Sequence, residues 1–485
     1  MSDNAETSLP LDQERDHDAA SAAGQAERRG RRLFAIGVAG LLGLIGYNVL
    51  NHDTEDVLHL YLGVAIIVLA TAPALIWARD ARFHLPVFEV FMLTAINTYA
   101  LPLLNGHTQL RFYDPEVITH AALTVVVFQA AAVATFFFVR GGPRFTPFWT
   151  RELLGDDAVR FLRYGVLLSA AYQYVSSYTT WIPWNFAGPL RAVFFGAGIV
   201  STFVLARLWG AGRLSPGNRA LFIAALAAQA YLALPGLVMI ATLSQIVLAL
   251  LGYVSSSRRL PLAVLLPLLA VTAVLHNGKA SMRERYWERD QSRSVPVTAL
   301  PDFYAEWFEA GFGRGEDNPA LAAKFVDRAS LFHILCLVVS RTPEKQPYLD
   351  GLTYSFIPGQ FVPRFLWPAK PVGHIATHTI GIYYGLIDEE STQHTTIAIG
   401  LLAEAFANFG TAGAIVLGIV MAAALRKVTL WAHHSPMFSG GGLLMVVLMA
   451  WSFQTELTLS IWLTSMFQAA IAVVVAPLLL HRFLS

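Results

Sequence analysis

Charged residues are scarce in this chain. Of its 485 residues only 14% are charged, whereas 55% are hydrophobic, and the mean hydropathy is +0.51. A soluble globular chain carries about 25% charged residues, so this deficit indicates that a lipid bilayer is the main solvent. The net charge of +1 leaves no large basic surface, and we expect no nucleic-acid partner.

Cysteine and several common catalytic motifs are missing as well. The single cysteine, Cys336, excludes an intrachain disulfide framework and a cysteine-based metal site. The sequence has no Walker loop and no glycine-rich nucleotide motif beside a strand. It also has no serine-centred nucleophile elbow. These absences argue against coupling to ATP within the chain and against a nucleotide-sugar donor bound in the cytosol.

Long apolar segments are what the chain has instead. A spanning helix needs about 20 mostly apolar residues, because the hydrocarbon core is about 30 Å thick and a helix rises about 1.5 Å per residue. The sequence predicts an all-α polytopic membrane protein with about 12 transmembrane helices, nine within 33–275 and three within 397–485. The predicted segments are 33–50, 57–77, 84–103, 117–139, 161–180, 186–208, 219–235, 237–255, 259–275, 397–424, 441–458 and 461–480. The seventh and eighth form either a hairpin or one broken helix.

Two regions fall outside these segments. Residues 1–32 are polar and charged, and we expect a disordered cytoplasmic tail. Residues 276–396 form one large polar insertion, in which 301–310 is predicted to be an amphipathic helix. A further helix is expected over 320–340, packed against the membrane domain. Four prolines between residues 358 and 371 exclude a long regular element there.

Basic residues alternate between the connecting loops. They gather in the loops on one side of the predicted membrane, and the short loops on the other side hold almost none, with Arg111 the exception. The basic set comprises Arg79, Arg82, Arg140, Arg144, Arg151, Arg207, Arg213, Arg258, Arg259, Arg426, Lys427 and Arg482. This is the positive-inside pattern. We therefore expect both termini to be cytoplasmic and the insertion to lie on the outer side.

Basic residues are also frequent in the insertion. A guanidinium group matches phosphate oxygens in a bidentate way, and a low-dielectric interface strengthens the pairing. These cations are expected to bind the phosphate or pyrophosphate of a lipid-linked substrate; the alternative is pairing with nearby carboxylates. The predicted set is Arg283, Arg328, Arg341, Arg364 and Lys370. Arg364 is the strongest, because prolines and Trp367 surround it, although that turn could simply cap the domain.

Glu404 and Asn408 stand in the segment that follows the insertion. They are four residues apart, so they share a helix face about 6 Å from each other. A carboxyl group within an apolar helix is costly and is by default a functional-site hypothesis. We expect Glu404 to accept a proton from an attacking hydroxyl, with structural pairing to an arginine as the alternative.

Histidine and arginine side chains complete the predicted site. His374 and His378 are four residues apart, but Pro371 and Gly373 make a local helix doubtful and no third metal ligand is evident. We therefore expect no metal, and a hydrogen bond from His374 to a sugar or phosphate. Arg191, at the outer end of the sixth segment, is predicted to line the same cavity.

The stretch 328–410 resembles the bacterial oligosaccharide repeat-unit polymerases of the O-antigen and exopolysaccharide (Wzy) type. The matching pieces are Arg341-Thr-Pro343, Tyr348-Leu-Asp-Gly-Leu-Thr-Tyr354, Ile357 with Pro363-Arg-Phe-Leu-Trp-Pro-Ala-Lys-Pro371, and Gly400 to Gly410. Residues 277–283 fit more loosely. The rest of the chain matches only in hydropathy and topology.

The resemblance implies a metal-independent membrane glycosyltransferase, without a cofactor, at the periplasmic face of the bacterial inner membrane. It would transfer a growing glycan from undecaprenyl pyrophosphate to the end of a new lipid-linked repeat. Positioning and charge stabilisation would supply most of the catalysis. We assign catalysis to Glu404 and Arg364. The residues assigned to substrate binding are Arg191, Arg283, Arg328, Arg341, Lys370, His374 and Asn408.

The expected partners are the lipid-linked glycan, membrane lipids, and a flippase and chain-length regulator of the same pathway. Two alternatives stay open. The first is an O-antigen ligase that passes the glycan to lipid A core. The second is of another class, a polysaccharide transporter or flippase, or a non-catalytic partner in an assembly complex.

Overall fold

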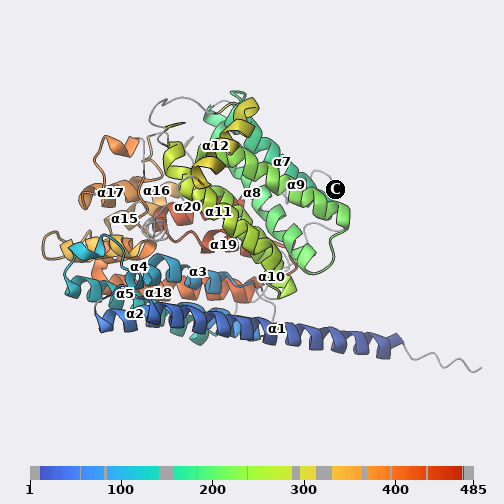
Figure 1. The fold of residues 1–485 in the computed structure, drawn as a ribbon, viewed down its shortest axis with the longest axis horizontal. Helices are drawn as coiled ribbons and strands as arrows, with labels where there is room; N and C mark the ends of the chain where they lie inside the picture. The colour runs from blue at the N-terminus through green and yellow to red at the C-terminus, as the bar shows by residue number, and fades with distance from the viewer. Residues whose placement is uncertain are drawn as a thin grey trace, which may run out of the picture.

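The structure is a computed structural model of the chain. It describes residues 11–54, 56–80, 85–140, 158–182, 184–237, 239–283, 285–286, 295–312, 330–362, 366–367, 369–393, 396–432, 435–471 and 473. The regular elements within these ranges are all helical (Figure 1). Eight of the described helices are long and apolar enough to cross a membrane. The all-α class and the multi-pass membrane character are confirmed, whereas the count of about 12 spans stays a prediction.

Helices occupy each of the apolar stretches that the sequence predicts. Up to the insertion they are α1 (Leu11–Leu50), α2 (Val57–Arg79), α3 (Val87–Ala95), the π-helical turn η1 (Ile96–Ala100), α4 (Leu101–Leu104), η2 (Leu110–Phe112), α5 (Pro115–Phe138), α7 (Ala158–Tyr178), α8 (Trp184–Gly210), α9 (Pro216–Ala233), η3 (Leu234–Gly236), α10 (Met239–Ser257) and α11 (Leu262–Arg283). The seventh and eighth predicted segments are therefore two helices, α9 and α10, separated by the turn η3.

The insertion and the segments after it are helical too, and apart from α18 these helices are short. They comprise η5 (Val297–Ala299), α12 (Leu300–Phe312), α14 (Phe332–Arg341), α15 (Leu352–Ser355), α16 (Ile357–Phe361), α17 (Ile375–Tyr383), η6 (Ser391–Gln393), α18 (Leu401–Ala432), α19 (Gly440–Ser452) and α20 (Leu459–Ala470). The helix predicted over 301–310 is confirmed as α12. In the proline-rich stretch, the longest helix that precedes α17 has five residues.

The long helices form two groups. In the first, α2 packs against α1, α3 and α5, and α5 packs against α18. In the second, α8 packs against α7 and α10, and α7 against α9. The short helices α19 and α20 lie between the groups, because α19 contacts α3, α8 and α10, and α20 contacts α8 (Figure 1).

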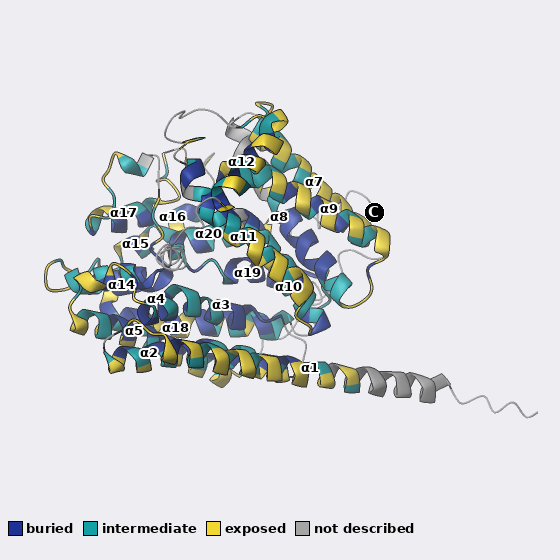
Figure 2. Cartoon of the chain, in the orientation of Figure 1, coloured by how far each residue is buried: buried dark blue, intermediate teal, exposed yellow. Residues whose placement is uncertain are grey.

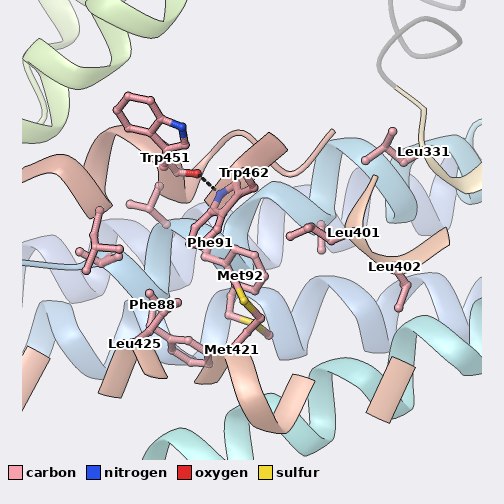
Figure 3. Packing of buried hydrophobic residues seen from close by; sticks show 14 of the residues in the cluster. Phe88, Phe91, Met92, Leu331, Leu401, Leu402, Met421, Leu425, Trp451 and Trp462 are labelled. Carbon is pink, nitrogen blue, oxygen red and sulfur yellow. Dashed lines mark hydrogen bonds between the residues drawn. The ribbon is translucent and has the colours of Figure 1, made fainter. Parts of the chain in front are cut away.

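Large apolar side chains fill the space between the groups. Phe88 and Met92 of α3 lie beside Met421 and Leu425 of α18, and Trp462 of α20 belongs to the same cluster (Figure 3). The Trp462 indole N–H donates to the Trp451 carbonyl at 2.9 Å, which satisfies a polar group that has no water available.

The outward faces are apolar as well. Only 6% of the apolar window of α1 is buried, and exposed residues run along α1, α9 and α11 (Figure 2). Leu50 and Leu266 are examples of large side chains left exposed. A helix that is hydrophobic all round suits a lipid environment, because lipid covers the face that the protein does not.

Helix directions agree with the alternation that loop charge predicts. α5 and α18 run parallel, since His120 contacts Thr411 near their starts and Arg426 reaches the Val139 carbonyl near their ends. Arg258 donates to the Trp77 carbonyl. Basic residues of separate loops therefore meet at one end of the bundle, opposite the start of α18. Which end faces the cytoplasm stays a prediction.

Three boundaries differ from the predicted ones. Residues 11–32, expected to be a disordered tail, continue α1, because this stretch is rich in Ala, Glu and Arg and the apolar half supplies a helix nucleus. α11 runs eight residues into the expected insertion. α19 ends at Ser452, before the predicted residue 458. α14 does pack against α5 and α18, as expected of the helix over 320–340, whose first part lies outside the described residues.

Labelling of single cysteines tests the predicted orientation. Gln109 is exposed between α4 and α5, and Ala211 is exposed between α8 and α9. In a Cys336→Ser background, a membrane-impermeant maleimide is expected to label Gln109→Cys in intact cells and Ala211→Cys only after lysis. The reverse pattern would place the insertion in the cytoplasm.

Candidate functional site at the break in α18

A break divides α18 one residue after Asn408. Phe409 has φ −145° and ψ 18°, and Gly410 has φ 63° and ψ −155°, so the helical path is lost at both residues. The conformation of Gly410 is essentially restricted to glycine. A β-carbon at this position would also lie 2.8 Å from the Tyr348 hydroxyl. The segment 401–408 is therefore a separate short helix.

The loop 348–354 closes over this break. The Leu349 amide donates to the Ala407 carbonyl at 2.9 Å, and the Gly351 amide donates to Asn408 Oδ1 at 3.0 Å. Asn408 Nδ2 donates in turn to Thr353 Oγ1, at 2.8 Å. Two pieces of the family resemblance, 348–354 and 400–410, are thus in direct contact although more than 45 residues separate them.

Glu404 lies beneath this loop with 0% of its surface exposed. Its Oε2 atom accepts a hydrogen bond of 2.6 Å from the backbone N–H of Leu459, the first residue of α20. The positive end of a helix dipole favours a negative charge at this position. The Thr353 hydroxyl lies beside the same carboxyl group. Among the described residues, Oε1 accepts no well-aligned hydrogen bond.

The loop between α19 and α20 completes the surroundings. The Gly400 amide donates to the Glu456 carbonyl at 2.9 Å, and the Leu401 amide approaches the Thr455 carbonyl at 3.3 Å. Gly400 has φ 83°, and a β-carbon there would lie 2.9 Å from Leu331. The start of α18 and the loop between α19 and α20 therefore meet here, close to the break in α18. We call Glu404, Asn408, Gly351, Thr353 and the Leu459 amide the α18 break cluster.

Two residues that were predicted to bind phosphate, Arg341 and Lys370, make hydrogen bonds to the backbone at helix ends. Arg341 donates to the Tyr384 carbonyl just after α17, where the negative end of the helix favours a cation. Lys370 Nζ donates to the carbonyls of Gln360, at 3.0 Å, and Val362, at 2.8 Å, at the end of α16. Their described contacts are with backbone carbonyls, not with the carboxylates that the alternative interpretation named.

The remaining described residues of the predicted site lie in other parts of the fold. Arg283 donates to the Leu237 carbonyl in the turn after η3, within a separate cluster around Trp307. Arg191 is exposed and lies 6.0 Å over the Phe195 ring on α8. The structure therefore does not bring Arg283 into contact with the α18 break cluster.

His374 occupies the N-cap position of α17 without a side-chain capping hydrogen bond, and its ring stacks on His378 with centroids 6.0 Å apart. Within the described residues, no group of three His, Cys, Asp or Glu side chains is placed to hold a metal ion. Arg328, Arg364 and His394 lie outside the described residues, so the predicted Glu404–Arg364 pair has no measured geometry.

Sequence reasoning missed the other half of the cluster. Thr353 and Gly351 belong to a quoted motif but had no assigned role, and the Leu459 amide carries no side-chain signal at all. A weak signal existed in Gln454-Thr-Glu456, three consecutive polar residues near the end of the predicted segment 441–458. His120 of α5 joins α18 through a hydrogen bond of 3.1 Å with Thr411.

No family model, curated protein or solved structure matches this chain. The resemblance to repeat-unit polymerases therefore rests on the motif residues alone.

Substitution of Gly410 tests the strain at the break. Gly410→Ala is expected to lower the free energy of unfolding by about 1–3 kcal/mol for the backbone alone, with a further loss against Tyr348. Gly212 is a matched control, because its φ is 74° and nothing lies within 4 Å of a β-carbon there. Thermal unfolding in detergent should show a larger loss for Gly410→Ala than for Gly212→Ala, and a smaller one in a Tyr348→Phe background. Equal losses at the two glycines would contradict the contact.

A double-mutant cycle tests the hydrogen bonds of Asn408. Asn408→Leu leaves the Gly351 N–H without its acceptor, at a cost of about 1–3 kcal/mol. Because Asn408 also donates to Thr353, its combination with Thr353→Val should deviate from additivity by about 0.5–3 kcal/mol in unfolding measurements. Asn51→Leu, at an exposed position, should change stability by less than about 0.5 kcal/mol. Strict additivity would show that the two side chains act independently.

Proposed function

We propose that this chain is a membrane glycosyltransferase that polymerises lipid-linked oligosaccharide repeat units at the end of the bundle that carries the α18 break cluster. We take this end to be the periplasmic face of the inner membrane, as the alternation of basic loops predicts. One observation carries the proposal: both motif segments, 348–354 and 400–410, meet around a buried carboxyl group.

The chemistry required is compatible with such a site. A glycan bound to pyrophosphate already has a good leaving group, so an enzyme gains most by positioning the acceptor and stabilising charge. Burial of a carboxyl group in an apolar bundle is costly. Thr353 and Asn408 beside it, together with the Leu459 amide, reduce that cost and fix its orientation.

Glu404 is a positioning residue in the conformation described. It is fully buried beneath the loop 348–354, so an acceptor hydroxyl reaches it only if this loop moves. Catalytic hydrogen bonds are often assembled only in the substrate complex. We therefore propose that substrate binding displaces the loop, after which Glu404 orients the acceptor hydroxyl or accepts its proton.

Pyrophosphate binding is assigned to the cations of the insertion. A guanidinium group has five N–H donors, and the Tyr384 carbonyl uses one nitrogen of Arg341. We assign the second cation to Arg364. In this scheme Lys370 positions the backbone of the site. Arg341 both positions the backbone and binds the pyrophosphate.

A transporter is the second candidate, and the broken helices favour it. Transporters place substrate sites where discontinuous helices end within the membrane, with helix N-termini directed at anionic groups. α18 is interrupted at Phe409, and α19 has only 13 residues. An O-antigen ligase would use the same pyrophosphate chemistry with lipid A core as acceptor.

Complementation of a deletion strain tests the assignment. Glu404→Gln keeps the side-chain volume and an acceptor for the Leu459 amide, so membrane protein levels should stay near wild type. Loss of a general base costs about 10²–10⁴-fold, so gels of surface glycan should show single-repeat products in place of long chains. Arg364→Ala should have the same result, and Arg364→Lys a partial one.

The controls and alternatives have separate signatures. Glu309→Gln on the exposed face of α12, and Arg213→Ala in an opposite loop, should leave chain lengths unchanged. A ligase defect would leave bare core with accumulated lipid-linked polymer. A transport defect would leave short lipid-linked repeats inside the cell. Normal chain lengths for both Glu404→Gln and Arg364→Ala would refute the site.

A further inference from the structure

A second polar region lies at the opposite end of the bundle, beside a cavity of about 270 Å³. Four helices enclose this cavity, namely α1, α2, α3 and α10, and nearly all of its lining is apolar. The lining includes Gly37, Ala74, Trp77, Val90, Leu93 and Leu251. A cavity with so apolar a lining gives water few hydrogen-bond partners, so hydrocarbon fills it better than water does.

Arg258 stands at the edge of the cavity, with 4% of its surface exposed. Its guanidinium carbon lies 3.8 Å from the centre of the Trp77 ring, and Nη1 donates to the Trp77 carbonyl at 2.9 Å. Burial lowers the pKa of Arg258 to about 10, while Asp80 and Glu89 act in the opposite direction. The side chain is therefore a cation at neutral pH.

A second arginine lies close to the first. Arg207 of α8 donates to Ser255, which lines the cavity, at 3.0 Å, and its charge acts on Arg258. Glu89 in the cavity wall and Asp80 at the end of α2 balance these two cations. The deeper part of the region is thus close to neutral.

The mouth of the cavity carries further positive charge, which these two carboxyl groups do not balance. α1 crosses the end of α2 at Gly30, where a β-carbon would lie 2.9 Å from the Ala78 carbonyl, and Leu33 of α1 lines the cavity. The cluster around Gly30 is therefore next to the opening. Its members are Arg28, Arg29, Arg31 and Arg32, of which Arg31 pairs with Glu27 at 2.7 Å, and Arg79 is exposed at the same end of α2.

We propose that this cavity is a binding site for one anionic phospholipid, with an acyl chain between α1 and α3 and the phosphate at the arginines of the mouth. Charge complementarity identifies the occupant. Basic residues directly beside a spanning helix attract anionic headgroups, and arginine forms bidentate hydrogen bonds with phosphate. α1 is largely exposed, so a chain can enter from the bilayer beside it. The site lies apart from the α18 break cluster and does not depend on the proposed glycan chemistry.

Native mass spectrometry of the full chain in neutral detergent tests the site by titration with phosphatidylglycerol and phosphatidylcholine. Phosphatidylglycerol should bind in preference. Ala74→Phe fills the cavity without a change of charge and should weaken binding about tenfold, whereas Ile76→Phe, on the exposed side of the same helix, should not. Combined Arg28→Gln, Arg29→Gln and Arg32→Gln should also weaken it about tenfold or more, because charged hydrogen bonds to phosphate are lost.

Two variants with different failure modes keep the test decisive. The arginine variant removes basic residues beside a spanning helix and could change its orientation, whereas Ala74→Phe leaves those residues intact. Equal binding of the two lipids, or no effect of Ala74→Phe, would overturn the proposal. Retention of a polyprenyl phosphate in place of phosphatidylglycerol would also overturn it, and would assign the cavity to an isoprenoid lipid. Arg213→Gln, at an exposed loop position, should match wild type.

Discussion

The hydrogen bond from the Leu459 amide to the Glu404 carboxylate fixes the start of α20 against the first turns of α18. A carboxyl group without partners at this depth would be strongly unfavourable, and so would the free N–H of a helix start. Each group satisfies the other at 2.6 Å. Thr353 and Asn408 extend this contact to the loop above, so the position of one carboxylate fixes the N-terminal turns of α18, the start of α20 and the loop 348–354.

Polar and charged groups are accommodated in different ways at the two ends of the apolar bundle. At the α18 break, polar groups are buried in a connected network of side chains and backbone, closed over by a loop. At the other end, arginines pair with carboxylates, backbone carbonyls and the Trp77 ring, and they border an apolar cavity. The first arrangement suits a site that opens to a polar substrate. The second suits a permanent contact with lipid headgroups, because its cations lie at the edge of a cavity that acyl chains can occupy.

The helix bounds predicted from the sequence agree best with the structure where the apolar run is long. α2 and α8 begin and end within two residues of their predicted bounds, since a long apolar run can bury its backbone in lipid only as a helix. α19 is shorter than expected, because the loop that follows it pairs its backbone carbonyls with the amides of Gly400 and Leu401 and so needs no helix. The cations of the insertion were identified as a group, but their carbonyl partners depend on folds of the chain that no local pattern encodes.

The sequence by itself determined the all-helical membrane character, the approximate helix bounds and the alternation of basic loops. These properties depend on composition and on the length of apolar runs, which are local. It also marked Glu404 and Asn408 as unusual, because polar groups in an apolar helix are costly wherever they pack. Only the tertiary structure decided that Thr353 and the Leu459 amide surround them. It alone showed that Arg283 lies in another cluster and that Arg258 lies on Trp77 beside a cavity. Such pairings join residues far apart in the chain, and their energy exists only when distant helices meet.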